Sequence, residues 1–110
     1  MPNNEDKITK ARAEFEQLEA QMTPHGSARG SLFGKPCLKI GTKSYACQFR
    51  DGVAFKLAPD PRAAALALSG AELFDPSGKG RPMKEWVQVP VKHAGKWAEL
   101  AQQALDYAGR

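Results

Sequence analysis

Residues 33–60, FGKPCLKIGTKSYACQFRDGVAFKLAPD, contain three short runs in which apolar and polar side chains alternate. Alternation with a period of two is the pattern of a β-strand that buries one face. The residues expected to face the core are Leu38, Ile40, Tyr45, Cys47, Phe49, Val53, Phe55 and Leu57. Gly41-Thr42 and Asp51-Gly52 separate the runs by connections short enough for tight hairpins. The stretch therefore predicts a three-stranded antiparallel meander.

Helical periodicity precedes the meander. Apolar side chains three or four positions apart draw one stripe along a helix that Thr23-Pro24 ends, namely Ile8, Ala11, Phe15, Leu18 and Met22. HGSARG, residues 25–30, is predicted to be a loop. Residues 1–29 are thus expected to form an N-terminal helix and a loop.

Two helices and two strands are predicted after the meander. Asp60, as the N-cap, and Pro61 open a helix that ends at Ser69-Gly70. Residues 72–74 and 83–89 have the composition of strands, with a flexible loop between them, and residues 93–108 have a helical apolar face. The order α-β(3)-α-β(2)-α predicts an α+β fold in which helices cover one face of an antiparallel sheet.

The length and composition are those of one ordinary globular domain. The chain has 110 residues, of which 42% are hydrophobic and 25% charged, with a net charge of +4. No apolar run is long enough to span a bilayer, and MPNNEDKITK lacks the apolar stretch of a secretory signal. We therefore expect a cytoplasmic protein without membrane contact. Its two cysteines, which lack CxxC spacing, are expected to be free thiols.

Residues 30–108 resemble the TfoX N-terminal-domain-like family, which is related to the YjbR-like proteins. The resemblance lies in FGKPCLKIGTKSYA, DGVAFKLAPD, GAELFDPSGKGRPMKEWVQVP and WAELAQQALDYA. Its most specific part pairs Phe33-Gly34-x-Pro36 with Met83-x-x-Trp86-x-x-Val89-Pro90. It implies the same α-β(3)-α-β(2)-α order and a bacterial, transcription-related regulatory domain. YjbR-like relatives are described as candidate DNA-binding proteins, and the family supplies no catalytic residues. In TfoX regulators a separate C-terminal domain follows, whereas here we expect a single domain over residues 1–110.

The sheet face opposite the expected core is polar and basic. Residues 29–56 hold six Lys or Arg against one acid, and the alternation places Cys37, Lys39, Ser44, Gln48, Arg50 and Lys56 on this face. Such a face suits contact with the phosphates of duplex DNA. Single-stranded binding is less favoured, because the meander aromatics are expected on the core side. A solvated face without a partner is the other interpretation.

Trp86 is the aromatic exception, since it shares its strand face with Lys84 and Gln88. It is expected either to anchor a protein partner, including a second copy of the chain, or to be buried under a helix. The residues predicted to bind DNA or a partner are Lys35, Lys39, Arg50, Lys56, Arg81, Lys84 and Trp86. The alternative function is a ligand-binding or enzymatic domain, in which Lys84 and Arg81 hold an anion in a pocket near Trp86.

Catalytic, metal and cofactor patterns are not recognisable. SGKG, residues 77–80, fails the phosphate-loop pattern at Leu73 and at Gly80, and the histidines and cysteines match no zinc spacing. We therefore expect no enzymatic activity, no metal and no cofactor. Cys37 and Cys47 are expected on opposite sheet faces. Cys37 is predicted to be the more reactive thiol, because Lys35 and Lys39 alternate onto its face.

Overall fold

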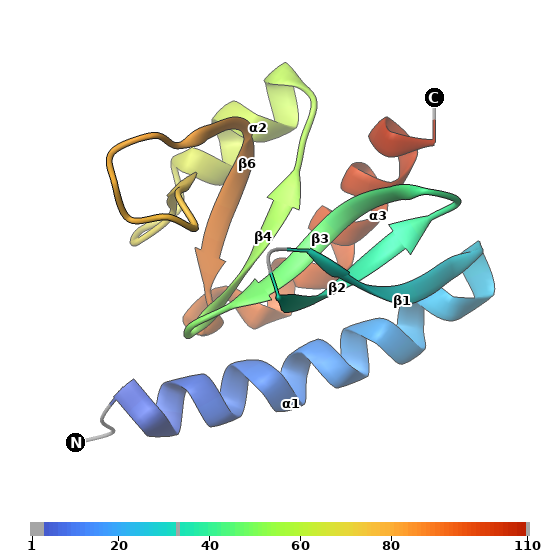
Figure 1. Ribbon diagram of the computed structural model, residues 1–110, viewed down its shortest axis with the longest axis horizontal. Helices are drawn as coiled ribbons and strands as arrows, with labels where there is room; N and C mark the ends of the chain where they lie inside the picture. The colour runs from blue at the N-terminus through green and yellow to red at the C-terminus, as the bar shows by residue number, and fades with distance from the viewer. Residues whose placement is uncertain (1–3, 33, 110) are drawn as a thin grey trace.

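Six strands form one antiparallel sheet in the order β1-β2-β3-β4-β6-β5 (Figure 1). The computed structural model describes residues 4–32 and 34–109. Within them the elements, in chain order, are α1 (Asn4–Met22), the 3₁₀ helix η1 (Thr23–His25), β1 (Ser27–Leu32), β2 (Lys35–Ile40), β3 (Lys43–Phe49), β4 (Gly52–Lys56), α2 (Pro59–Leu66), β5 (Glu72–Phe74), β6 (Met83–Pro90), the 3₁₀ helix η2 (Val91–Lys96) and α3 (Trp97–Ala108).

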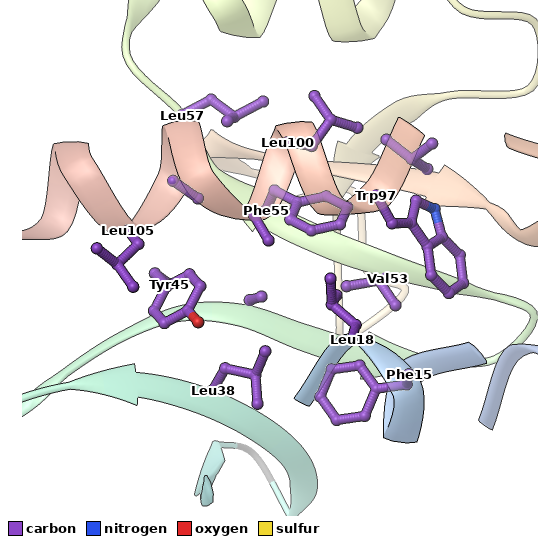
Figure 2. Packing of buried hydrophobic residues seen from close by; sticks show 14 of the residues in the cluster. Phe15, Leu18, Leu38, Tyr45, Val53, Phe55, Leu57, Trp97, Leu100 and Leu105 are labelled. Atoms are coloured by element: carbon purple, nitrogen blue, oxygen red, sulfur yellow. The ribbon is translucent and has the colours of Figure 1, made fainter. Parts of the chain in front are cut away.

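The helices cover one face of the sheet and enclose the main core. Helix α3 packs against β3 and β4, α1 packs against α3, and α2 packs against β6. Side chains from α1, α3 and the sheet converge between these layers, among them Phe15, Tyr45, Phe55 and Trp97 (Figure 2). The predicted α+β architecture, with an antiparallel sheet covered by helices, is confirmed.

Strand β1 lies where the sequence predicts a loop. It pairs along its whole length with β2, from Ser27 opposite Ile40 to Leu32 opposite Lys35. Its sequence, SARGSL, has too few apolar side chains to show a period of two, so the backbone pairing with β2 determines its place. Two side-chain contacts fix it further: Tyr45 donates a hydrogen bond of 2.7 Å to Ser27 Oγ, and Arg29 pairs with Glu19 of α1 at 2.9 Å. The meander therefore has four strands, not three.

A β-bulge interrupts the pairing of β2 with β3. Leu38 lies opposite Ala46 and Lys39 opposite Ser44, so Tyr45 is an extra residue without a partner of its own. Tyr45 and Ala46 both belong to the main core on the helix side. The alternation after the bulge is shifted by one residue, which turns Cys47 and Phe49 to the other face and turns Gln48 towards the helices. The predictions that Cys47 and Phe49 face the helix-covered core and that Gln48 faces outward are wrong for this reason.

The face turned away from α1 and α3, which we call the outer face, has a small core of its own. It consists of Cys37, Cys47, Phe49, Ala54, Phe74 and Trp86, with Leu32 and Met83 packed against them. The Phe49 and Phe74 rings meet edge to face with centroids 5.2 Å apart, and the Phe74 and Trp86 centroids lie 6.1 Å apart. The sheet is therefore buried on both faces.

Two helix starts differ from the prediction. Helix α2 begins at Pro59 with Ala58 as its N-cap, so Asp60 lies in the first turn and does not cap it. The last helical segment begins as η2 and becomes α-helical at Trp97. In both places a proline determines the entry point: Pro59 is the first helical residue after the extended Ala58, and Pro90 is the extended N-cap of η2.

Replacing Phe55, whose side chain is fully buried between the sheet and the helices, tests the main core. We expect Phe55→Ala to lower the free energy of unfolding by about 3–5 kcal/mol, because it removes buried apolar surface and leaves a cavity. Leu66→Ala is the control, since Leu66 is 37% exposed. It should change the free energy by about 0.5 kcal/mol or less. Urea denaturation followed by circular dichroism measures both, and equal losses would contradict the assignment of Phe55 to the core.

Candidate polyanion-binding face

Three lysines project from the strands onto the outer face: Lys35 and Lys39 flank Cys37 on β2, and Lys56 on β4 lies opposite Trp86. Lys84 lies two residues before Trp86 on β6, where the pairing with β5 is irregular. Arg50 occupies the turn between β3 and β4, and Arg81 lies in the loop between β5 and β6. All the lysines and arginines that the sequence predicts for the site therefore lie on this face or at its border.

Phe49 holds two of these cations at one end of the face. Lys35 Nζ lies 5.5 Å from the centroid of the Phe49 ring, and Arg50 Cζ lies 5.1 Å from it. Arg50 has a φ of 53°, in the left-handed region that favours glycine, and its carbonyl accepts a hydrogen bond of 2.8 Å from Gln48 Nε2. The tight turn and the ring together direct the Arg50 side chain over Phe49.

The remaining cations differ in how they are held. Lys56 Nζ lies 3.7 Å from Glu85 Oε2, which makes a partly exposed ion pair. The aliphatic part of Lys39 lies over Gly30 of β1, where a side chain at residue 30 would otherwise sit. Lys84 and Arg81 are exposed. The outer face therefore offers several cationic groups to solvent, and in the described part of the chain one of its lysines has a carboxylate partner within 4 Å.

The aromatic side chains beneath these cations are shielded from solvent. Phe74 is 0% exposed, Trp86 5% and Phe49 7%. Of the two predictions for Trp86, an interface anchor or burial under a helix, the structure agrees with burial. The side chain lies against Phe74 on the outer face, however, and not under a helix. Base stacking needs an accessible ring face, and these rings are occupied by one another and by the cations above them.

The loop between β5 and β6, residues 75–82, is organised around Asp75 (gold in Figure 1). Asp75 Oδ1 accepts hydrogen bonds from Ser77 Oγ at 2.9 Å and from the Gly78 N–H at 3.1 Å, and Oδ2 accepts one from the Gly80 N–H at 2.9 Å. The Ser77 hydroxyl, followed by these backbone amides, lowers the pKa of Asp75. The loop that carries Arg81 thus has an internal hydrogen-bond frame where the sequence predicts a flexible connection.

A cavity of about 480 Å³ lies between this loop and the sheet. Phe49, Arg50, Glu72, Gln88 and several loop residues line it. Trp86, Lys84 and Arg81 are not among its described lining residues, so this cavity does not unite the three side chains that the alternative function requires.

The two cysteines lie directly opposite each other on β2 and β3, both on the outer face. The prediction that they occupy opposite faces is wrong, because the bulge at Tyr45 shifts the alternation of β3. Both thiols are free and 0% exposed. Burial, and secondly the nearby Cys37, raises the pKa of Cys47 to about 12, with Lys35 acting in the opposite sense. The reactivity of Cys37 stays a prediction.

A catalytic base, a metal site and a membrane span each place their own requirements on the described residues. His93 Nε2 lies 2.9 Å from the carbonyl oxygen of Ser69, away from both cysteines in the described structure. In the described residues, His, Cys, Asp and Glu form no group of three that could hold a metal ion. None of the helices described is long and apolar enough to cross a membrane.

Comparison with models of known protein families gives no match, and no curated protein and no solved structure matches the chain significantly. The resemblance to TfoX N-terminal-like domains therefore stays a prediction, and Phe33 of its most specific motif lies outside the described residues.

Ionisation of Cys47 predicts a loss of stability at alkaline pH. The folded state raises its pKa from 9.0 to about 12, so folding favours the protonated thiol. This contribution is complete below pH 9 and is lost as the pH rises from 9 towards 12, because the unfolded chain releases the proton first. Burial raises the pKa of Tyr45 also, which adds in the same direction.

Urea denaturation at several pH values checks this contribution. Cys47→Ala should show a shallower fall in the free energy of unfolding above pH 9 than the unchanged protein. A Tyr45-dependent fall should remain in the variant. Identical pH profiles would show that Cys47 ionises equally well in the folded state.

Proposed function

We propose that the protein is a non-catalytic binding domain that contacts the phosphate backbone of duplex DNA through its outer face. The transcription-related, regulatory setting rests on the resemblance of residues 30–108 to TfoX N-terminal-like domains. The observation that carries the proposal is the group of lysines on the outer face, of which Lys56 alone has a carboxylate partner within 4 Å among the described residues.

Charge and position support contact with a polyanion. Lysine and arginine neutralise phosphates and release condensed counterions whatever the base sequence. Lys35 and Lys39 stand four residues apart on β2, a separation of about 13 Å along an extended strand. This is close to the width of the major groove, about 12 Å. The two lysines are therefore anchored about one groove width apart, so their flexible side chains can reach phosphates on the two sides of one groove.

Burial of the aromatic rings favours a duplex over a single strand. The bulge brings Phe49 to the basic face, next to Phe74 and Trp86, and this combination is typical of single-strand binding surfaces. The three rings are at most 7% exposed, however, so they have no free face for a base. Phosphate contact remains available to the lysines, whereas base stacking requires the small core to open.

Salt dependence of DNA binding tests the proposal. Four phosphate contacts predict that affinity for a duplex falls about a hundredfold between about 50 and 200 mM salt. Changing Lys35, Lys39 and Lys84 together to Gln should weaken binding and reduce the slope of log affinity against log salt by about three. Fluorescence anisotropy with a labelled duplex measures both effects, and an equimolar single strand should compete no better than unlabelled duplex.

The matched control removes the same charge from another surface. Lys7 and Lys10 on α1 and Lys96 in η2 are exposed, and their joint change to Gln should leave most of the affinity intact. Equal weakening by both triple variants would leave only a net-charge effect and contradict the outer face as the site. If the protein does not bind DNA but forms a homodimer or binds another protein, that interaction would replace DNA binding as the function of the outer face.

A small anionic ligand is the second candidate, at a different place from the one predicted near Trp86. Arg12, Arg29, Lys35 and Arg50 line a cavity of about 460 Å³ between α1 and the ends of β2 and β3. Arg29 is engaged by Glu19 at 2.9 Å, so Arg12, Lys35 and Arg50 are the groups to test.

Thermal unfolding with inorganic phosphate and with citrate separates the two candidates. A ligand of this cavity at 100 times its dissociation constant should stabilise the protein by about 2.7 kcal/mol, and Arg12→Gln should abolish the effect. Arg12→Gln should leave duplex binding nearly unchanged if the outer face is the site. Stabilisation that persists in Arg12→Gln would exclude this cavity.

A further inference from the structure

Cys37 and Cys47 form a cross-strand pair whose backbone geometry can be derived from the register. Arg50 and Asp51 make a two-residue turn, so its closing pair, Phe49 with Gly52, exchanges hydrogen bonds. Hydrogen-bonded and non-hydrogen-bonded pairs alternate, which makes Cys47 with Ala54 a hydrogen-bonded pair. The N–H and C=O of Cys47 therefore point to β4 and away from β2.

The facing pair Cys37 and Cys47 is consequently of the non-hydrogen-bonded type. Such pairs have Cα atoms about 4.5 Å apart and the closer side chains of the two types. Disulfides join cysteines whose Cα atoms are about 4.4 to 6.8 Å apart. The two side chains also share one face of the sheet, within one packed cluster. The backbone thus already meets the main geometric requirement for a disulfide.

The packing provides a route to Cys37. Its neighbour on the edge strand β1 is Gly30, which places no side chain over the thiol. A Cβ atom at residue 30 would lie 3.5 Å from Cys37 Sγ and would displace the aliphatic part of Lys39. Lys39 is a flexible side chain outside the main core, and we expect its rotation to open the β1 side of Cys37 to solvent. Cys47 lies one strand further from this edge.

We propose that Cys37 and Cys47 are a dithiol modification site, which a peroxide oxidises to an intramolecular disulfide between β2 and β3. The thiolate of Cys37 attacks one peroxide oxygen, the O–O bond breaks, and Cys37 becomes a sulfenic acid. Cys47 Sγ then attacks Cys37 Sγ, loses its proton and displaces the sulfenic oxygen as water. Two thiols and one hydrogen peroxide thus give one disulfide and two water molecules. The evidence for this site does not rest on the proposed DNA contact.

The order of attack follows from the surroundings of each thiol. Cys37 has Lys35 and Lys39 on either side of it on the same face and Ser44 Oγ 3.4 Å from its sulfur. Burial raises the pKa of Cys47 to about 12, which makes its reactive thiolate scarcer than that of a thiol at the ordinary value. Cys37 is therefore the residue that reacts first, and Cys47 is the residue that resolves the sulfenic acid.

Oxidation of the folded protein tests the site. The native protein is treated with hydrogen peroxide, quenched with catalase, unfolded and alkylated with iodoacetamide, and its mass is measured. We expect a monomer that is lighter by two hydrogen atoms and carries no alkyl group, together with a higher melting temperature that dithiothreitol reverses. Oxidation in urea should give the disulfide more slowly, because the sheet no longer holds the thiols together.

The single variants assign the roles. Cys47→Ser should accumulate a Cys37 sulfenic acid that dimedone traps, whereas Cys37→Ser should react with peroxide several-fold more slowly than Cys47→Ser. If a variant does not fold, the mass of the oxidised unchanged protein still shows whether the intramolecular disulfide forms. A disulfide that forms only in urea, links two chains, or is replaced by sulfinic acid in the native protein overturns the proposal.

Discussion

The extra residue in β3 determines which side chains meet on each face of the sheet. Without the bulge opposite Leu38, strict alternation would bury Tyr45, Cys47 and Phe49 together beneath the helices. With it, Tyr45 stays on the helix side, where it reaches Ser27 of β1, while Cys47 and Phe49 join Cys37, Phe74 and Trp86. The bulge therefore gives the sheet two cores and places the smaller one directly beneath the lysines.

The helices, the strands with a clear apolar period and their antiparallel connection are readable in the sequence, because side-chain burial there follows one repeating pattern. Strand β1 is not, since its place depends on backbone pairing with β2 and on Tyr45, which lies 18 residues from Ser27. The bulge cannot be recognised in the sequence either. The alternation in YACQF predicts that Tyr45, Cys47 and Phe49 share one face, whereas pairing with β2 turns Cys47 and Phe49 to the other face. The lysines and arginines of the candidate site were predicted, whereas the burial of Trp86 on the outer face and the pairing of the cysteines follow from the shifted phase.

A face can serve both as a core and as a contact surface when long cationic side chains cover it. Lysine and arginine can lay their stems over apolar groups while the charged end remains in water. Lys39 does this over Gly30 beside Cys37, whereas Lys35 and Arg50 place their charged groups over the Phe49 ring. These side chains shield the small core and at the same time raise the positive potential above it.

This arrangement links the charge of the outer face to the protection of what lies beneath. To engage a phosphate, Lys39 must extend its ammonium group, which draws its stem away from Gly30. For Lys39, extension uncovers the side of Cys37 that Gly30 leaves without a side chain. Methionine has an unbranched side chain like the aliphatic stem of lysine but no charge, so Lys39→Met should keep Cys37 shielded while removing one phosphate contact. Lys39→Ala should remove both. A difference between these two variants in the rate of Cys37 oxidation separates the role of the stem from that of the charge.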